Sequence, residues 1–129
     1  MEKIACLISL GSNTDGDKYL EKAREKLESF FPDIRYGKAC QTIPVEIHNP
    51  SLFLNQIAIF RTYQTVSEVK RILKEIELAC TAIPKDKQHE RIYIDIDLLQ
   101  FGEKILKAED WKRSYVQEGI AGLLLVAEQ

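Results

Sequence analysis

The segment IYIDIDLLQF, residues 92–101, carries the clearest strand signal in this chain. Its residues alternate between two sets, which is the period of a β-strand with one face in a core. The core-facing set is Ile92, Ile94, Ile96 and Leu98, and the opposite set is Tyr93, Asp95, Asp97 and Leu99. The sequence therefore predicts a strand that carries two aspartates on the face away from the core.

Two amphipathic helices are predicted before this strand. From about residue 15 to residue 30, apolar side chains recur at helical spacing with Lys and Glu between them. Thr65 and Glu68 match a capping box, and an apolar stripe then continues to Cys80. Each helix is expected to lay its apolar face on a sheet.

Three further strands complete the pattern. The apolar run 4–10 indicates a buried strand that ends in a turn at Gly11-Ser12-Asn13. Residues 35–42 have weak strand character and are expected to pair with the β-rich stretch 53–63. The order β-α-β-β-α-β is that of the ferredoxin-like, or split βαβ, arrangement. We therefore expect an α+β sandwich, an antiparallel sheet with two helices on one face.

Length and composition fit one globular domain, residues 1–129. We expect this domain to lie in the cytoplasm. Hydrophobic residues make up 45% of the 129 residues and charged residues 29%, as in ordinary globular proteins. The net charge of −2 gives no polyanion-binding signature, so nucleic acid is not an expected partner. The N-terminal apolar run is too short for a membrane span. Cys6, Cys40 and Cys80 show no zinc-ligand spacing, which favours buried thiols.

The aspartate pair has two interpretations. Asp95 and Asp97 are expected to lie roughly 7 Å apart on one face of their strand. Their repulsion is a cost unless a cation lies nearby, and carboxylates suit Mg²⁺ bound to nucleotide phosphates. The alternative is an open, solvated sheet face on which these residues pair with Lys or Arg. Aspartate is unfavourable inside strands, which shifts the balance toward a functional pair.

Three other residues stand out for their surroundings. Glu77 lies beside the apolar stripe of the second helix, where a glutamate is usually solvated. Asn55 faces away from the core of an otherwise apolar strand, so its amide needs a ligand or loop backbone as partner. Trp111 is better explained as a packing residue than as a platform for a nucleotide.

Taken together, three stretches resemble the 6-hydroxymethyl-7,8-dihydropterin pyrophosphokinase family of folate biosynthesis. They are Leu10-Gly11-Ser12-Asn13; Thr42-Ile43-Pro44-Val45 followed by Phe53-Leu54-Asn55-Gln56; and Ile76-Glu77 followed by Ile94-Asp95-Ile96-Asp97-Leu98-Leu99 and Phe101-Gly102. Their order and spacing over residues 4–107 carry the resemblance. The family's fold is ferredoxin-like, and its reaction passes the β- and γ-phosphates of ATP to the pterin's hydroxymethyl group, releasing AMP.

The resemblance implies roles for particular residues. Asp95 and Asp97 would be catalytic and would bind two Mg²⁺ ions that bridge the phosphates of ATP. The pterin-binding set would be Thr42, Pro44, Val45, Phe53 and Asn55, with Phe53 stacked on the ring. Glu77 would contact the nucleotide. The expected partners are thus two small molecules, a pterin and ATP, while the oligomeric state stays open.

The segment 80–91 departs from the family pattern. The family shows several arginines and a Trp-Gly-Pro-Arg stretch here, whereas this chain reads CTAIPKDKQHER. Lys85, Lys87 and His89 are the candidate nucleotide contacts, and Arg91 is a candidate catalytic residue one position from the expected place. Lysine is a point charge without the fork that lets arginine grip phosphate with two hydrogen bonds.

Three functions follow from these observations. The leading hypothesis is an ATP- and Mg²⁺-dependent pyrophosphokinase acting on a hydroxymethyl-dihydropterin. The second is a catalytically weak relative that binds pterin or nucleotide and regulates or assists a partner; the altered 80–91 segment and a tail without the family's Pro-His-Tyr motivate it. The third is a ferredoxin-like interaction module with an exposed sheet face.

Overall fold

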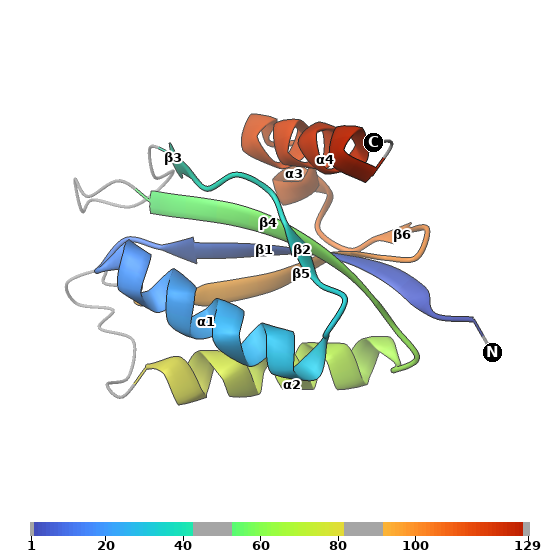
Figure 1. Ribbon diagram of the computed structural model, residues 1–129, viewed down its shortest axis with the longest axis horizontal. Coiled ribbons are helices and arrows are strands. Elements are labelled where there is room, and N and C mark those ends of the chain that lie inside the picture. The colour runs from blue at the N-terminus through green and yellow to red at the C-terminus, as the bar shows by residue number, and fades with distance from the viewer. Residues whose placement is uncertain (1, 43–52, 82–91, 128–129) are drawn as a thin grey trace.

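The computed structural model describes residues 2–42, 53–81 and 92–127. Its elements are β1 (Ile4–Ser12), α1 (Gly16–Phe30), β2 (Arg35–Tyr36), β3 (Cys40–Thr42), β4 (Phe53–Thr62), α2 (Val66–Cys80), β5 (Asp95–Phe101), β6 (Lys104–Ile105), α3 (Ala108–Trp111) and α4 (Ser114–Ala127). One antiparallel sheet has the order β2-β4-β1-β5-β6, with β3 also paired to β4 (Figure 1). The central order and the two intervening helices are those of the predicted ferredoxin-like fold.

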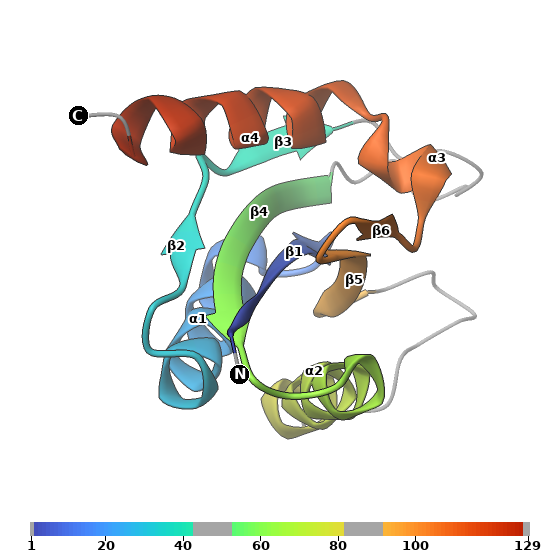
Figure 2. The ribbon, with the colours of Figure 1, turned by 90° about the vertical axis from the view of Figure 1, so that its right-hand side faces the viewer.

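Helices α1 and α2 lie together on one face of the sheet, as predicted (Figure 2). Alternate residues of the strands supply the main core, for example Ile8 and Leu10 of β1, both fully buried. Phe60 of β4 stacks on Phe31 with ring centroids 3.9 Å apart. The predicted capping box at the start of α2 is present, with the Thr65 hydroxyl accepting the Glu68 N–H. Both helices are therefore held by packing against the core, and α2 is also capped at its start.

The opposite face of the sheet carries α4, with the short α3 before it (Figure 1). A second apolar cluster forms there from Leu7, Ile57, Leu99, Val116 and Leu123. The sequence pattern did not predict this layer, because residues 114–127 are apolar around most of the helix and include two glycines. In the described parts of the chain, no helix has the length and apolar character needed to cross a membrane.

Two strand boundaries differ from the prediction. The turn expected at residues 11–13 begins only at Asn13, because Gly11 pairs with β4 on one side and β5 on the other. The last strand starts at Asp95 rather than at residue 92. Strict alternation predicted that Tyr93 faces away from the helices, and this is wrong. Tyr93 packs against Tyr19 of α1, with 5.2 Å between the ring centroids.

The predicted edge strand 35–42 pairs with β4 but is broken into β2 and β3. The break contains Gly37, whose carbonyl accepts the side-chain amide of Gln56 at 2.8 Å. A Cβ on Gly37 would lie 3.0 Å from Ile57 and 3.5 Å from the Cα of Gly119 in α4. The close passage of α4 over this point gives a physical reason for glycine here.

The three cysteines are free. Cys6 and Cys80 are buried, as predicted, and burial raises the pKa of the Cys6 thiol to about 12. Cys40 is only partly buried, so the prediction of a buried thiol is wrong there. The reason is its position on the short outer strand β3, which pairs with β4 alone.

Candidate active site

The sheet face toward α4 changes from apolar to polar along its strands. Asn55, Gly11 and Asp95 are direct neighbours across β4, β1 and β5. Adjacent strands lie about 4.8 Å apart, so the backbones of Asn55 and Asp95 are roughly 10 Å apart. This cross-strand row brings a residue predicted to bind the pterin and a residue predicted to bind metal onto one surface.

Gly11 forms the floor between the two ends of that row. A Cβ at this position would lie 3.2 Å from Asn55 Oδ1 and 3.7 Å from the Phe53 ring. A Cβ here would therefore press on the Asn55 amide, touch the Phe53 ring and take up space above the strand. The sequence indicated Gly11 as part of a turn and of a stretch shared with the family, but not this role, because its position between two strands is visible only in the sheet.

Three of the residues predicted to bind the pterin lie together. Thr42 of β3 is paired with Phe53 of β4, and the Asn55 Nδ2 group donates to the Thr42 hydroxyl and to the Phe53 carbonyl. Asn55 is buried. The sequence predicted that the Asn55 amide needs a partner. In the structure its partners are the Thr42 hydroxyl and the Phe53 backbone carbonyl. The two other predicted members, Pro44 and Val45, lie outside the described residues.

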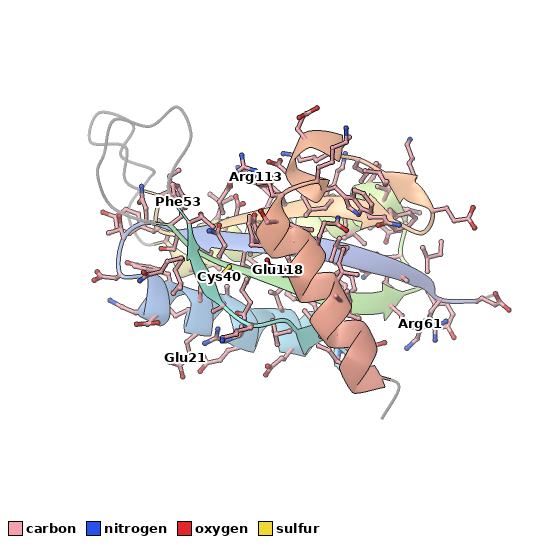
Figure 3. All side chains as sticks on the ribbon, turned by 90° about the horizontal axis from the view of Figure 1, so that it is seen from above. Glu21, Cys40, Phe53, Arg61, Arg113 and Glu118 are labelled. Carbon is pink, nitrogen blue, oxygen red and sulfur yellow. The ribbon has the colours of Figure 1, made fainter. Side chains whose placement is uncertain are left out.

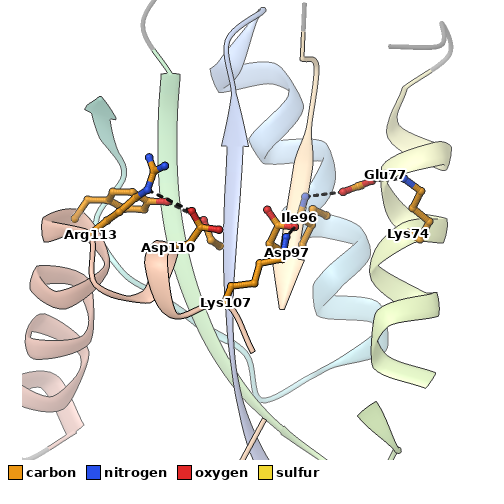
Figure 4. Close-up of polar contacts among 9 residues, drawn as sticks. Lys74, Glu77, Ile96, Asp97, Lys107, Asp110 and Arg113 are labelled. Carbon is orange, nitrogen blue, oxygen red and sulfur yellow. Dashed lines mark hydrogen bonds and ion pairs between the residues drawn. The ribbon is translucent and has the colours of Figure 1, made fainter. Parts of the chain in front are cut away.

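The aspartate pair lies on the face predicted for it, and both residues are partly exposed. The Lys107 ammonium donates to Asp97 Oδ1 at 3.0 Å (Figure 4). Burial raises the pKa of Asp97, and the neighbouring Asp95 charge raises it further, whereas Lys107 opposes the shift. The hydrogen bond to Asp97 in turn raises the pKa of Lys107. The charged form of the Asp97 carboxylate is therefore disfavoured where it lies, and a cation bound to it would relieve that cost.

The donor set suits Mg²⁺ bound together with a phosphate ligand. Within the described residues no group of three or more Asp, Glu, His or Cys side chains could hold a metal ion. Two carboxylates are too few for an all-protein cage but are the usual protein share when Mg²⁺ keeps waters and binds substrate phosphates. Asp95 and Asp97 therefore fit the ion that the resemblance implies.

Glu77 of α2 is buried, so the expectation of a solvated helix glutamate is wrong. Its Oε2 atom accepts the Ile96 N–H at 2.7 Å, and its Oε1 atom lies 3.4 Å from Lys74 Nζ (Figure 4). Ile96, whose backbone N–H makes this bond, is the residue between Asp95 and Asp97. Glu77 thus ties α2 to the part of β5 that carries the pair, a contact that no sequence pattern indicates.

A pocket of about 330 Å³ lies beside the aspartate pair, between α2 and the β5–β6 hairpin. It is lined by the acidic residues Glu77, Asp95 and Asp97, the basic residues Lys70, Lys74 and Lys107, and the apolar residues Leu73, Ile96, Leu98 and Leu106. No sequence pattern distinguishes the three lysines, because lysines on a helix or turn surface are usually solvated. The predicted phosphate contacts Lys85, Lys87, His89 and Arg91 lie outside the described residues.

Asn13 fixes the chain where it approaches β5. Its Oδ1 atom accepts the Ile92 N–H at 2.7 Å, and its own N–H donates to the Ile92 carbonyl at 3.0 Å. These two bonds fix Ile92, which lies three residues before Asp95. The Gly-Ser-Asn segment therefore positions the aspartate strand from the opposite side to Glu77.

The tail contributes packing next to the site. Trp111 packs against the second apolar cluster and donates its indole N–H to Gln100 Oε1 at 3.0 Å, in agreement with a packing role. The Tyr115 hydroxyl lies 3.1 Å from the Ser9 hydroxyl. Viewed from above, α4 crosses the strands obliquely and leaves Phe53 beyond its edge (Figure 3). The polar row thus begins where the cover of α4 ends.

Comparison with solved structures finds weak similarity. The C-terminal domain of the MgtC protein from Mycobacterium tuberculosis is 10% identical, with a TM-score of 0.41, covering 82% of this chain and 94% of that one. A de novo designed protein with a ferredoxin fold is 14% identical, with a TM-score of 0.34, covering 83% and 94%. No curated protein matches the sequence.

Comparison with family models gives a specific result. The model of the 7,8-dihydro-6-hydroxymethylpterin-pyrophosphokinase (HPPK) family matches residues 7–124, nearly the whole chain. The matched range includes the polar row, the aspartate pair and the residues that line the adjacent pocket. The chain belongs to the 7,8-dihydro-6-hydroxymethylpterin-pyrophosphokinase family.

Proposed function

We propose that this chain is an ATP- and Mg²⁺-dependent pyrophosphokinase that acts on 6-hydroxymethyl-7,8-dihydropterin and releases AMP. The observation that carries the proposal is the cross-strand row Asn55, Gly11 and Asp95. It puts a candidate pterin-binding amide and a candidate metal-binding carboxylate on one face, about two strand spacings apart. Family membership supports the same class of reaction.

The pterin would lie over Gly11 against Asn55. A side-chain amide offers both a donor and an acceptor, which matches the edge of a flat heterocycle with both kinds of group. Phe53 would stack on the ring, and Thr42 would complete the edge contacts. In the free protein Asn55 is paired with Thr42, so the amide is already oriented before a ligand arrives. Pro44 and Val45 remain proposed members of this subsite.

ATP would occupy the pocket beside the aspartate pair. Its volume of about 330 Å³ lies at the lower end of the range for small-molecule sites. The leucine side chains on its wall would contact the base, Glu77 would lie beside the nucleotide, and the lysines would face the phosphates. Asp95 and Asp97 would hold two Mg²⁺ ions, whose chemistry is to neutralise and orient the phosphates.

The reaction needs positioning more than covalent chemistry from the protein. The pterin hydroxyl oxygen would attack the β-phosphorus of ATP, forming one O–P bond while the bond to the α,β-bridging oxygen breaks. AMP leaves with that oxygen, and the hydroxyl proton passes to solvent. The chain would hold the two reactants in line, which is the main requirement of phosphoryl transfer. Lys85, Lys87, His89 and Arg91 are proposed phosphate contacts.

A second candidate function is binding of pterin or nucleotide with little catalysis. The sequence of residues 80–91, with one arginine in place of the family's several, favours it. An arginine that stabilises charge in phosphoryl transfer is worth about 10³-fold or more in rate. The interaction-module hypothesis has less support, because α3 and α4 cover part of the face that it needs open.

We propose the cytoplasm as the compartment of this reaction and small molecules as its partners. All three thiols are free, as is usual in a reducing compartment. ATP and a reduced pterin would both be present there. No nucleic-acid or membrane partner is required by the proposed reaction.

The test is AMP release from ATP with Mg²⁺ and 6-hydroxymethyl-7,8-dihydropterin, comparing the natural chain with Asp95→Asn. We expect AMP only when the pterin is present, and a loss of about 10³-fold in Asp95→Asn, equivalent to about 4 kcal/mol of transition-state stabilisation. Glu103→Gln is the matched control, because Glu103 is an exposed carboxylate of the same hairpin and does not line the pocket. A folded chain that binds the pterin but makes no AMP would establish the binding function instead.

A further inference from the structure

Lys107 lies outside the three stretches that carry the family resemblance. It lies between β6 and α3, and its Nζ atom is 3.0 Å from Asp97 Oδ1. Its side chain is 48% exposed and that of Asp97 is 34% exposed, so the contact lies at the mouth of the site. Lys107 also lines the pocket beside the aspartate pair. One side chain thus contacts a proposed metal ligand and the proposed nucleotide pocket at once.

The charges around Asp97 explain why a cation is favoured there. Asp95 of the same strand and Asp110 of α3 both act on Asp97 with negative charge. Asp110 is itself paired with Arg113 at 3.3 Å, and Lys70 and Lys74 face the pocket from α2. Lys107 is the residue that the structure hydrogen-bonds directly to Asp97 Oδ1. In the metal-free protein, the Lys107 ammonium therefore occupies the place at Asp97 where a metal ion would bind.

An ammonium and a divalent cation compete for that oxygen atom. Two positive centres about 4 Å apart repel each other, and the partial exposure of both side chains weakens this repulsion without removing it. Binding of Mg²⁺ to Asp97 would therefore displace the Lys107 ammonium. Lysine has a flexible four-carbon stem, and a lysine that is half exposed loses little packing when it moves.

We propose that Lys107 is a mobile counter-cation of the site: it pairs with Asp97 in the free protein and moves to the ATP phosphates when Mg²⁺ takes the carboxylate. The proposal rests on the proposed function, since it needs ATP·Mg²⁺ in the pocket. With Asp95 and Asp97 holding the metal and Asp110 paired with Arg113, the phosphate oxygens would offer negative charge to a displaced ammonium that already lines the pocket. Lys107 would then supply, from the β6–α3 link, positive charge that the family obtains from loop arginines.

The test is a pair of calorimetric titrations on Lys107→Gln, one with Mg²⁺ alone and one with the magnesium complex of α,β-methylene-ATP, which resists transfer. Removing the competing ammonium is expected to tighten Mg²⁺ binding about threefold to tenfold. Removing a phosphate contact is expected to weaken the nucleotide complex about tenfold. Lys104→Gln, in the same hairpin but outside the pocket, is expected to change neither constant by more than twofold.

The opposite signs of the two shifts separate this role from others. Two shifts in the same direction would overturn the proposal, because Lys107 would then only shape the site. No shift in either would also overturn it and leave an ordinary surface ion pair. Lys107→Arg keeps the charge and is expected to stay within about threefold of the natural chain in both titrations; if Lys107→Gln fails to fold, a more than tenfold loss of nucleotide binding in Lys107→Arg overturns the proposal.

Failure of the proposal and failure of the proposed function give different results. If the natural chain releases AMP but Lys107→Gln titrates like the natural chain, only the role of Lys107 is wrong. If the natural chain binds the pterin and Mg²⁺ but neither binds the ATP analogue nor releases AMP, the proposed function fails, and the proposal for Lys107 fails with it.

Discussion

The two faces of the sheet use alternate residues of the same strands but are built differently. Toward α1 and α2, strand β1 presents Cys6, Ile8 and Leu10 in turn, and all three are buried in one core. Toward α4, the same strand presents Leu7, Ser9 and Gly11 in turn. Leu7 packs under α4, Ser9 bonds to Tyr115, and Gly11 leaves bare backbone beside Asn55.

The difference shows how one sheet can serve stability and binding together. The continuous core under β1, β4 and β5 makes the strands rigid, and α4 packs only on part of their other face. The polar row lies where that packing stops. A site built on strands that are fixed from behind can hold its side chains within the narrow tolerance that catalysis requires.

The largest expected effect is on the face toward α1 and α2. Phe60→Ala removes a buried ring that stacks on Phe31 at 3.9 Å, and we expect it to lower the free energy of unfolding by about 3–5 kcal/mol. Leu123→Ala, in the cluster under α4, is expected to lower it by about 2 kcal/mol. Urea denaturation measures both. A larger loss in Leu123→Ala would mean that the α4 face, and not the helix pair, is the main source of stability.

A smaller effect tests how closely α4 approaches the sheet. A Cβ on Gly119 would lie 2.5 Å from Ile57 Cγ1, so Gly119→Ala is expected to push α4 outward and cost about 1–3 kcal/mol. Gly122→Ala is the matched control in the same helix, because its Cβ would meet nothing within 4 Å. The control is expected to stabilise the helix by about 0.5–1 kcal/mol. If both changes raised the melting temperature by the same amount, the close approach of α4 to Ile57 would be contradicted.

The smallest effect concerns the pH dependence that Asp97 confers on the metal-free protein. Its pKa is raised, first by burial and then by Asp95, so the folded state binds more protons than the unfolded state above the usual pKa of about 3.9. Stability therefore falls as the pH rises through the folded pKa. In EDTA, the natural chain is expected to lose stability relative to Asp97→Asn over the pH interval that begins at the usual aspartate pKa and ends above the raised pKa of the folded state. A relative gain over that interval would mean that the Lys107 ion pair outweighs burial and the Asp95 charge.

Much of the framework could be predicted from residue patterns. The periodicities of residues 15–30, 65–80 and 92–101 identified the two helices and the aspartate strand, because amphipathic periods of 3.6 and 2.0 report directly on burial. The capping box located the start of α2 to the residue. The resemblance to the HPPK family, confirmed by the match over residues 7–124, singled out Asn55 and the aspartate pair as candidates.

The remaining features depend on contacts between distant segments. The burial of Glu77 follows from its bond to Ile96, and the role of Gly11 follows from its position between β4 and β5. Neither leaves a local pattern in the sequence. The cover by α4 depends on Gly119, which lets the helix pass close to Ile57, in a segment with little periodicity.

The sequence by itself determined the order of the main elements, the core toward α1 and α2, and the pairing of two aspartates on one strand face. These depend on spacing along the chain, which the strand and helix periods convert into faces. Only the tertiary structure decided that Asn55 and Asp95 lie in one row across Gly11 and that Lys107 meets Asp97. Those relations depend on register between strands and on the path of the chain after β5, which hydrogen bonding and packing across the whole sheet select.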